Sequence, residues 1–302
     1  MTQTILVAGS TGMLGSRIAH HLVRQPDTRI RLLVRGANHN PKRGVIEPLL
    51  ALGAELVDGY LADRNSLDRA SAGVDVIVSA VQGGPDVIVD GQIALAEVGR
   101  LNGVRRMLPS DFALDFFKAR PGEHFMFNLR QQADAAIAAT GIEAIHILQG
   151  GFMEMFRLGG GVLDAATKTV SYWGDGQQLI ELTSVEDTAR MTARVALDRS
   201  VKAGKFAFAG DRVSFQQVAA IVEKETGLQL QRVSLGSEEA LRSALAKAQQ
   251  DHANPFQAVM LAYQLYMLTG QTALENLQND RYPDLRLETF STFAARSLRT
   301  PS

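Results

Sequence analysis

The stretch that decides the fold is TILVAGSTGMLG, residues 4–15, near the start of a chain of 302 residues. Residues 4–8 are apolar and rich in β-branched side chains, which is typical of a strand buried on both faces. Three glycines follow, and then a helical pattern from Ser16 to about Gln25. Glycines let the backbone approach a pyrophosphate, whose charge suits the unpaired N–H groups of a helix N-terminus. We therefore predict a dinucleotide cradle that consists of Gly9, Thr11, Gly12, Met13, Leu14 and Gly15.

Arg35 follows the next predicted strand, residues 30–34, at the position that selects the ribose. An Asp or Glu there binds the two ribose hydroxyls of NAD, whereas a cation suits the 2′-phosphate of NADP. Lys42 lies in the following loop and is either a second cation for that phosphate or an ordinary surface lysine. We predict that the cofactor is NADP(H). The alternative is a glycine turn that binds nothing, with Arg35 a solvated strand end.

Composition excludes several classes of protein. Lys and Arg number 31 against 32 Asp and Glu, so no bulk charge indicates a nucleic acid or a membrane surface as partner. The chain has no cysteine, which rules out disulfides, thiolate nucleophiles and cysteine metal sites. Its first apolar run is short and leads directly into the glycine turn, unlike a signal peptide. We expect a soluble cytoplasmic protein.

The first half of the chain alternates between strand and helix patterns. Further strands are predicted at residues 55–58, 74–79, 105–108 and 143–148. This alternation indicates an α/β fold with a doubly wound parallel sheet of the Rossmann type, whose ligands bind at the carboxyl ends of the strands. The candidate cofactor contacts that follow later strands are Ala80, Val81, Gln82, Ser110 and Phe112.

The second half has shorter strand candidates mixed with helices. We predict an NADP-binding domain over residues 1–150 and a smaller mixed α/β part over 151–302, interleaved with the sheet, that forms a substrate lid. The substrate candidates are Phe112, Gly151, Phe152 and Tyr172. Tyr172 packs equally well in a core.

A catalytic motif common among short-chain dehydrogenases is missing. Tyr-x-x-x-Lys places a phenol and an ammonium one helical turn apart, so that the lysine lowers the pKa of the phenol. Four positions after the five tyrosines stand Arg64, Gly176, Met267, Gly270 and Arg286. None is lysine, so the usual dyad is absent.

The chain instead resembles an atypical short-chain dehydrogenase group that includes isoflavone reductase, phenylcoumaran benzylic ether reductase, pinoresinol–lariciresinol reductase and the NmrA-like regulators. The segments that carry the resemblance are GSTGMLG (9–15), LVR (33–35), VDVIVSA (74–80), VRRMLPSDF (104–112), ATGI (139–142), WGDG (173–176) and VED (185–187). The resemblance implies NADPH, hydride transfer to a small aromatic or conjugated substrate, and Phe112 near the nicotinamide. It also implies a catalytic lysine on the helix before Gly141.

Arg130 stands at the position of that lysine. Arginine keeps the positive charge and can hold a ribose hydroxyl or an oxyanion, but with a pKa above ~12 it does not act as a general acid. Asp111 and His124 are candidates to supply the proton. Alternatively, Asp111 caps a loop and His124 is a surface residue at a helix start. The histidines show no metal-ligand spacing with carboxylates, so we predict no metal.

Two functions fit these observations. The first is an NADPH-dependent reductase of quinones, enones or benzylic ethers, which need little proton transfer from the enzyme. The second is a non-catalytic NmrA-like sensor that binds NADP(H) and acts through a protein partner, as the loss of the lysine would allow. A homodimer is a possible assembly of this chain.

Overall fold

The computed structural model of the chain describes residues 2–36, 41–157, 161–251 and 253–298. The chain forms two compact units, and each is assembled from three segments. Unit 1 takes Met1–Phe112, Leu129–Ile147 and Thr188–Phe206, and unit 2 takes Ala113–Asn128, Leu148–Asp187 and Ala207–Ser302. The units are therefore interleaved along the chain.

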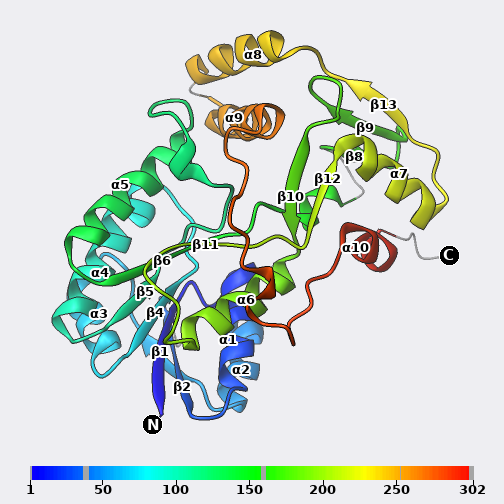
Figure 1. The fold of residues 1–302 in the computed structure, drawn as a ribbon. Helices are drawn as coiled ribbons and strands as arrows, with labels where there is room; N and C mark the ends of the chain where they lie inside the picture. Colours follow the sequence, from blue (N-terminus) through cyan, green and yellow to red (C-terminus); the bar gives the residue numbers. More distant parts are fainter. Residues whose placement is uncertain (1, 37–40, 158–160, 252, 299–302) are drawn as a thin grey trace. The chain divides into compact units, whose positions relative to one another are not determined.

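The main sheet contains seven strands: β1 (Gln3–Ala8), β2 (Thr28–Val34), β3 (Glu55–Asp58), β4 (Val76–Ser79), β5 (Arg106–Leu108), β6 (Glu143–Leu148) and β11 (Gly204–Ala207). Their order is β11-β6-β5-β4-β1-β2-β3 (Figure 1). Every pairing among β1 to β6 is parallel. The order 3-2-1-4-5-6 is that of a Rossmann sheet, so the predicted fold class is confirmed.

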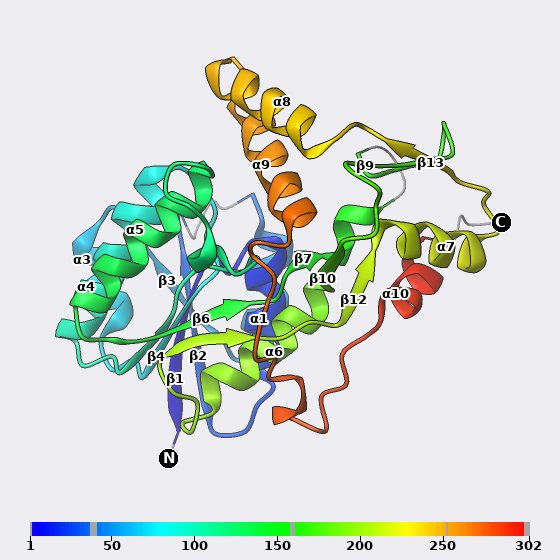
Figure 2. The same cartoon turned by 45° about the horizontal axis from the view of Figure 1, so that its top comes forward.

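Helices cover both faces of this sheet. They are α1 (Met13–Val23), α2 (Arg43–Ala51), α3 (Arg64–Ser71), α4 (Gln92–Leu101), α5 (Phe125–Ala139) and α6 (Val185–Leu197), and a π-helical turn, η2 (Asp86–Gly91), leads into α4. In both views α3, α4 and α5 lie on one face, and α1 and α6 on the other (Figures 1 and 2). Residues 5–8 of β1 are almost fully buried because both faces are covered. The apolar run in the sequence reflects this position.

Unit 2 has two smaller three-stranded sheets. Its strands are β7 (Gly151–Phe152), β8 (Leu163–Asp164), β9 (Thr169–Tyr172), β10 (Leu179–Thr183), β12 (Asp211–Ser214) and β13 (Gln231–Ser234). The orders are β12-β10-β7 and β13-β9-β8, each with one parallel and one antiparallel pairing. The predicted mixed α/β character of the second part is therefore confirmed.

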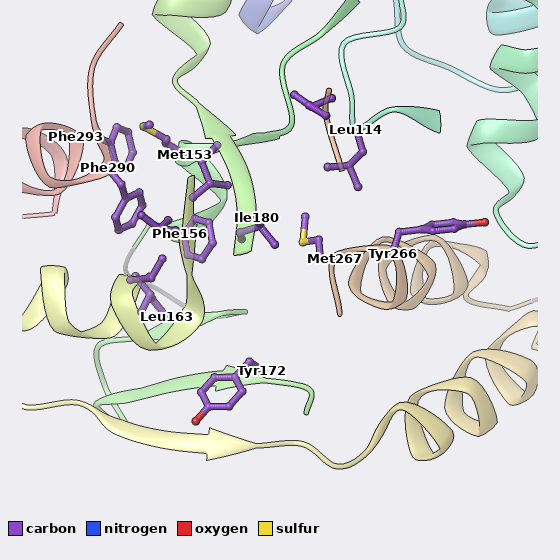
Figure 3. Close-up of a cluster of buried hydrophobic side chains, with 14 of the residues drawn as sticks. Leu114, Met153, Phe156, Leu163, Tyr172, Ile180, Tyr266, Met267, Phe290 and Phe293 are labelled. Carbon is purple, nitrogen blue, oxygen red and sulfur yellow. The ribbon is translucent and has the colours of Figure 1, made fainter. Parts of the chain in front are cut away.

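Four α-helices complete unit 2: α7 (Phe215–Thr226), α8 (Glu238–Gln250), α9 (Pro255–Thr269) and α10 (Phe290–Ser297). Its core is rich in aromatic side chains, and Phe156 packs edge-on against Phe290 with ring centroids 5.3 Å apart (Figure 3). None of the helices in the described ranges is both long and apolar enough to cross a bilayer.

Candidate functional site

The turn between β1 and α1 requires glycine at two positions. Gly9 has a φ of +81°, and a Cβ there would lie 2.3 Å from the carbonyl oxygen of Ala80. A Cβ on Gly15 would lie 2.3 Å from the carbonyl oxygen of Gly9. Both distances are far shorter than any van der Waals contact. The turn therefore packs directly against the carboxyl end of β4, as a phosphate cradle requires.

The N-terminus of α1 suits an anion. Gly12 is the N-cap and offers no side-chain cap, and the first turn contains no acidic residue. The first N–H groups of any helix lack partners within the helix, so these donors are available to a ligand. The hydroxyls of Ser10 and Ser79 are also buried and have no hydrogen-bond partner among the described residues. These observations fit a pyrophosphate. Sequence reasoning did not single out Ser10, although it lies inside the glycine motif.

Arg35 lies at the same edge of the sheet as this turn. Strands β1 and β2 are parallel, and Ala8 pairs with Leu33. Gly9 follows β1 and Arg35 follows β2, so both residues lie at the carboxyl ends of neighbouring strands. Arg35 is exposed, and so is Lys42, which is the N-cap residue of α2. Residues 37–40 between them lie outside the described residues. A role for either cation in phosphate binding stays a prediction.

Ser110 joins the carboxyl ends of two strands. Its N–H donates to Gln92 Oε1 at 2.7 Å, and its hydroxyl donates to the carbonyl oxygen of Val81 at 2.7 Å. Gln92 is fully buried on α4. These bonds give Ser110 a structural role at the end of β5, and its predicted cofactor contact is untested. Of its neighbours, Ala80, Val81 and Phe112 are half-buried and Gln82 is exposed.

Asp111, Asp134 and His146 form a cluster, here called the buried trio. Asp111 follows β5, Asp134 lies on α5 and His146 on β6, and their side chains are 0%, 5% and 12% exposed. A hydrogen bond of 2.8 Å joins Asp111 Oδ2 and His146 Nδ1, and Asp134 Oδ2 lies 3.5 Å from the same nitrogen. Sequence analysis identified only Asp111. The missed signal was a histidine inside the apolar strand EAIHIL.

The carboxyl of Asp134 is strongly perturbed. Burial raises its pKa from 3.8 to about 9, the Asp111 carboxylate acts in the same direction, and the positive charge of Arg130 opposes both. Both oxygens of Asp134 and Oδ1 of Asp111 are buried without a hydrogen-bond partner among the described residues. A neutral acid is therefore the favoured form of Asp134 at neutral pH.

Arg130 is half-buried on α5, one helical turn before Asp134. Its Nε donates to the carbonyl oxygen of Ser110 at 3.3 Å. This bond holds the guanidinium beside the carboxyl end of β5, where ligands of such sheets bind. The geometry is compatible with the predicted catalytic position.

His124 lies in the core of unit 2 and not on the surface, as one interpretation of the sequence had it. Its ring stacks on Phe127 with centroids 3.8 Å apart, and Tyr263 meets it edge-on at 4.4 Å. Its Nδ1 accepts a hydrogen bond of 3.3 Å from the N–H of Phe127. The aromatic packing accounts for this histidine, and its catalytic role is an untested prediction.

The substrate candidates of unit 2 also take part in its packing. Tyr172 belongs to the hydrophobic cluster of unit 2 (Figure 3) and is 6% exposed. Its hydroxyl accepts a bond of 2.7 Å from Gln216 Nε2. Gly151 and Phe152 are half-buried and form β7, which pairs with β10. Contact of these residues with a substrate is untested.

Comparisons with known proteins agree on the family. Residues 1–292 match the family model described as the NmrA-like family. A phenylcoumaran benzylic ether reductase of Ginkgo biloba is 25% identical over 305 residues, which cover 96% of this chain and 97% of that protein. Pinoresinol reductase 1 of Arabidopsis thaliana is 26% identical over 261 residues, 78% of each chain.

Solved structures share the fold. A structure described as AtPrR2 with NADP+ and (+)pinoresinol superposes with a TM-score of 0.84 at 23% identity and covers 98% of both chains. An isoflavone reductase structure gives a TM-score of 0.83 at 21% identity, with 97% of this chain and 99% of that one covered. The match over nearly the whole length shows that this chain belongs to the NmrA-like family.

Proposed function

We propose that the protein is an NADPH-dependent reductase that transfers hydride to a small aromatic or conjugated substrate. The observation that carries this proposal is the glycine turn at the N-terminus of α1, with Arg35 at the same edge of the sheet. Two relatives are named as reductases of benzylic ethers and of pinoresinol, and one solved neighbour was determined with NADP+. These names support the same class of activity.

The residues divide into roles according to their chemistry. The N–H groups at the start of α1 and the turn from Gly9 to Gly15 would hold the pyrophosphate. Arg35, assisted by Lys42, would bind the 2′-phosphate, because guanidinium and phosphate form strong charge-assisted bonds. When bound, the reduced nicotinamide supplies the hydride. Phe112 is the candidate to contact it.

Arg130 would stabilise negative charge that develops on the substrate oxygen. A fixed positive charge in a poorly hydrated site lowers the energy of an oxyanion without giving up a proton. We therefore expect Arg130→Ala to bind NADPH with unchanged affinity and to lose turnover by roughly 100-fold, the range seen when one oxyanion donor is removed.

The test is NADPH oxidation, followed by absorbance, against a panel of quinones, enones and benzylic ethers. NADPH affinity is measured separately by fluorescence titration. Turnover of any panel member with loss in Arg130→Ala supports the reductase. Tight NADPH binding with no turnover would favour the second candidate, a redox sensor, for which the replacement of lysine by Arg130 is the supporting observation.

A further inference from the structure

The buried trio places two carboxyl groups and an imidazole in a small space. Their nearest nitrogen and oxygen atoms all lie within 4.8 Å of one another. Two carboxylates at this separation, with 0% and 5% of their side chains exposed, repel each other and have lost hydration. The charged or titratable groups that face Asp134 are Asp111 after β5, His146 on β6 and Arg130 on its own helix. At least one proton must therefore reside in the cluster to limit its negative charge.

A shared proton fits the distances better than a metal ion. Two ligands of one tetrahedral zinc, each about 2.0–2.1 Å from the ion, lie about 3.3 Å apart. Asp111 Oδ2 and His146 Nδ1 are only 2.8 Å apart, the length of a hydrogen bond. A zinc ion bound by these three groups would need a fourth ligand such as water.

We infer that Asp111, Asp134 and His146 share a buried proton and deliver it, through Asp111, to the oxygen of the substrate during reduction. This inference rests on the proposed function. His146 Nδ1 is central, because it lies within 3.5 Å of both Asp134 Oδ2 and Asp111 Oδ2. Asp111 Oδ1 is buried and has no hydrogen-bond partner among the described residues, so this carboxyl keeps an acceptor site that the trio does not use.

The position of Asp111 in the chain links the trio to the proposed site of reduction. It follows Ser110, whose carbonyl accepts from Arg130, and precedes Phe112. The trio therefore supplies what Arg130 lacks, because a guanidinium carries charge but does not release its proton at neutral pH. The raised pKa of Asp134 is consistent with a carboxyl that still holds a proton under these conditions.

The bonds, electrons and protons of the proposed step are those of a carbonyl or quinone reduction. The new C–H bond forms with the two electrons of the hydride from NADPH, which is oxidised to NADP+, and the C–O π electrons move onto oxygen. The new O–H bond forms with a proton released by Asp111. Asp111 receives that proton on Oδ2 from His146 Nδ1, whose N–H bond breaks, and Nδ1 then takes the proton of Asp134, whose O–H bond breaks. Solvent then returns one proton to the trio through His146, whose side chain is 12% exposed.

The first test needs no turnover. Infrared difference spectra of the full chain, with aspartate labelled with carbon-13, are recorded from pH 5 to pH 10. We expect a protonated carboxyl band at neutral pH that disappears near pH 9 and is missing in Asp134→Asn. Asp280→Asn is the control, because Asp280 is exposed and distant in sequence. Absence of the band in wild-type protein at neutral pH would overturn the inference, whatever the activity.

The second test uses the pH profile of turnover on any active panel member. We expect kcat of Asp134→Asn to fall roughly 100-fold, within the range of general acid catalysis, with unchanged affinity for NADPH. The wild-type rate should decline as pH rises through about 9, the pKa of Asp134, and the variant should lack this decline. An unchanged profile in a folded, NADPH-binding variant refutes proton delivery. A divalent metal retained at one equivalent by the wild type and lost in Asp134→Asn would also overturn it. Failure of the reductase proposal is seen separately, as NADPH binding without turnover.

Discussion

Replacing Asp134 with asparagine should change the pH dependence of stability in a defined direction. Asn has nearly the shape of Asp but does not titrate. In the folded protein burial raises the pKa of Asp134 to about 9, compared with 3.8 for an ordinary aspartate. Below pH 3.8 the carboxyl is protonated in both the folded and the unfolded state. Between these values the folded state keeps the proton and the unfolded chain loses it.

The sign follows from proton binding. Because the folded state binds more protons than the unfolded state between pH 3.8 and about 9, the free energy of unfolding falls as pH rises across this window. The slope for one proton is about 1.4 kcal/mol per pH unit. From pH 5 to pH 8 the wild-type protein should lose about 4 kcal/mol through this group alone. That is a large part of a typical total stability of about 5–15 kcal/mol.

The assay is urea denaturation of the wild type and of Asp134→Asn at pH 5, 6, 7 and 8, followed by circular dichroism. Titrating groups remote from the trio act equally in both proteins, so the difference between the two reports on Asp134 together with its electrostatic neighbour Asp111. We expect the free energy of unfolding of the variant, relative to that of the wild type, to rise by about 1.4 kcal/mol per pH unit. The free energy of unfolding of Asp280→Asn should change with pH in the same way as that of the wild type. A difference that stays flat between pH 5 and pH 8 would show that Asp134 is ionised in the folded protein.

Three further variants test the site. Arg35→Ala should weaken NADPH binding roughly 10- to 100-fold, the worth of one charge-assisted bond, and leave NADH binding unchanged. Arg29→Ala, at the opposite end of β2, is its control, and equal losses for both cofactors would exclude the 2′-phosphate role. Gly15→Ala should abolish NADPH binding and lower the melting temperature, because its Cβ would lie 2.3 Å from a backbone oxygen; normal binding by fluorescence titration would contradict the packing of the turn. Arg130→Lys, introduced into Asp134→Asn, should restore turnover because lysine supplies a proton donor. If the double variant still binds NADPH but turnover does not recover, Arg130 and Asp134 do not have the separate roles of cation and proton donor.

The sequence was most informative where structure is local. The strand, the glycine turn and the helix follow one another in the predicted order, because each depends on neighbours a few positions away; the helix begins at Met13, three residues before the predicted start at Ser16. The alternation of strands and helices also specified the parallel sheet, since parallel neighbours need crossover helices. Strand β11 was predicted only as a short strand of the second half. Its place beside β6 in the main sheet depends on tertiary packing, which its four residues do not encode.

The residues of the candidate site also fall into those that a local motif located and those that only the fold brings together. Arg35 and the glycines have fixed spacings from one strand, so the motif located them. Ser110 stays a predicted ligand contact, and its N–H and hydroxyl donate to Gln92 and Val81, which lie 18 and 29 residues earlier. The partners of Asp111 are 23 and 35 positions away, on α5 and β6. No spacing rule links three residues on separate elements until the fold brings them together.

The replacement of lysine by Arg130 has a structural counterpart on the same helix. A lysine can provide both positive charge and a proton, and arginine retains only the charge. Asp134 lies one helical turn further on, so its side chain follows that of Arg130 on the same helix face. The positive charge of Arg130 favours ionised Asp134, while burial and Asp111 favour the protonated form, and burial is the largest of these effects. The two properties of one lysine are thus divided between a fixed cation and a neutral acid, which is a chemically sufficient arrangement for reduction of a polarised double bond.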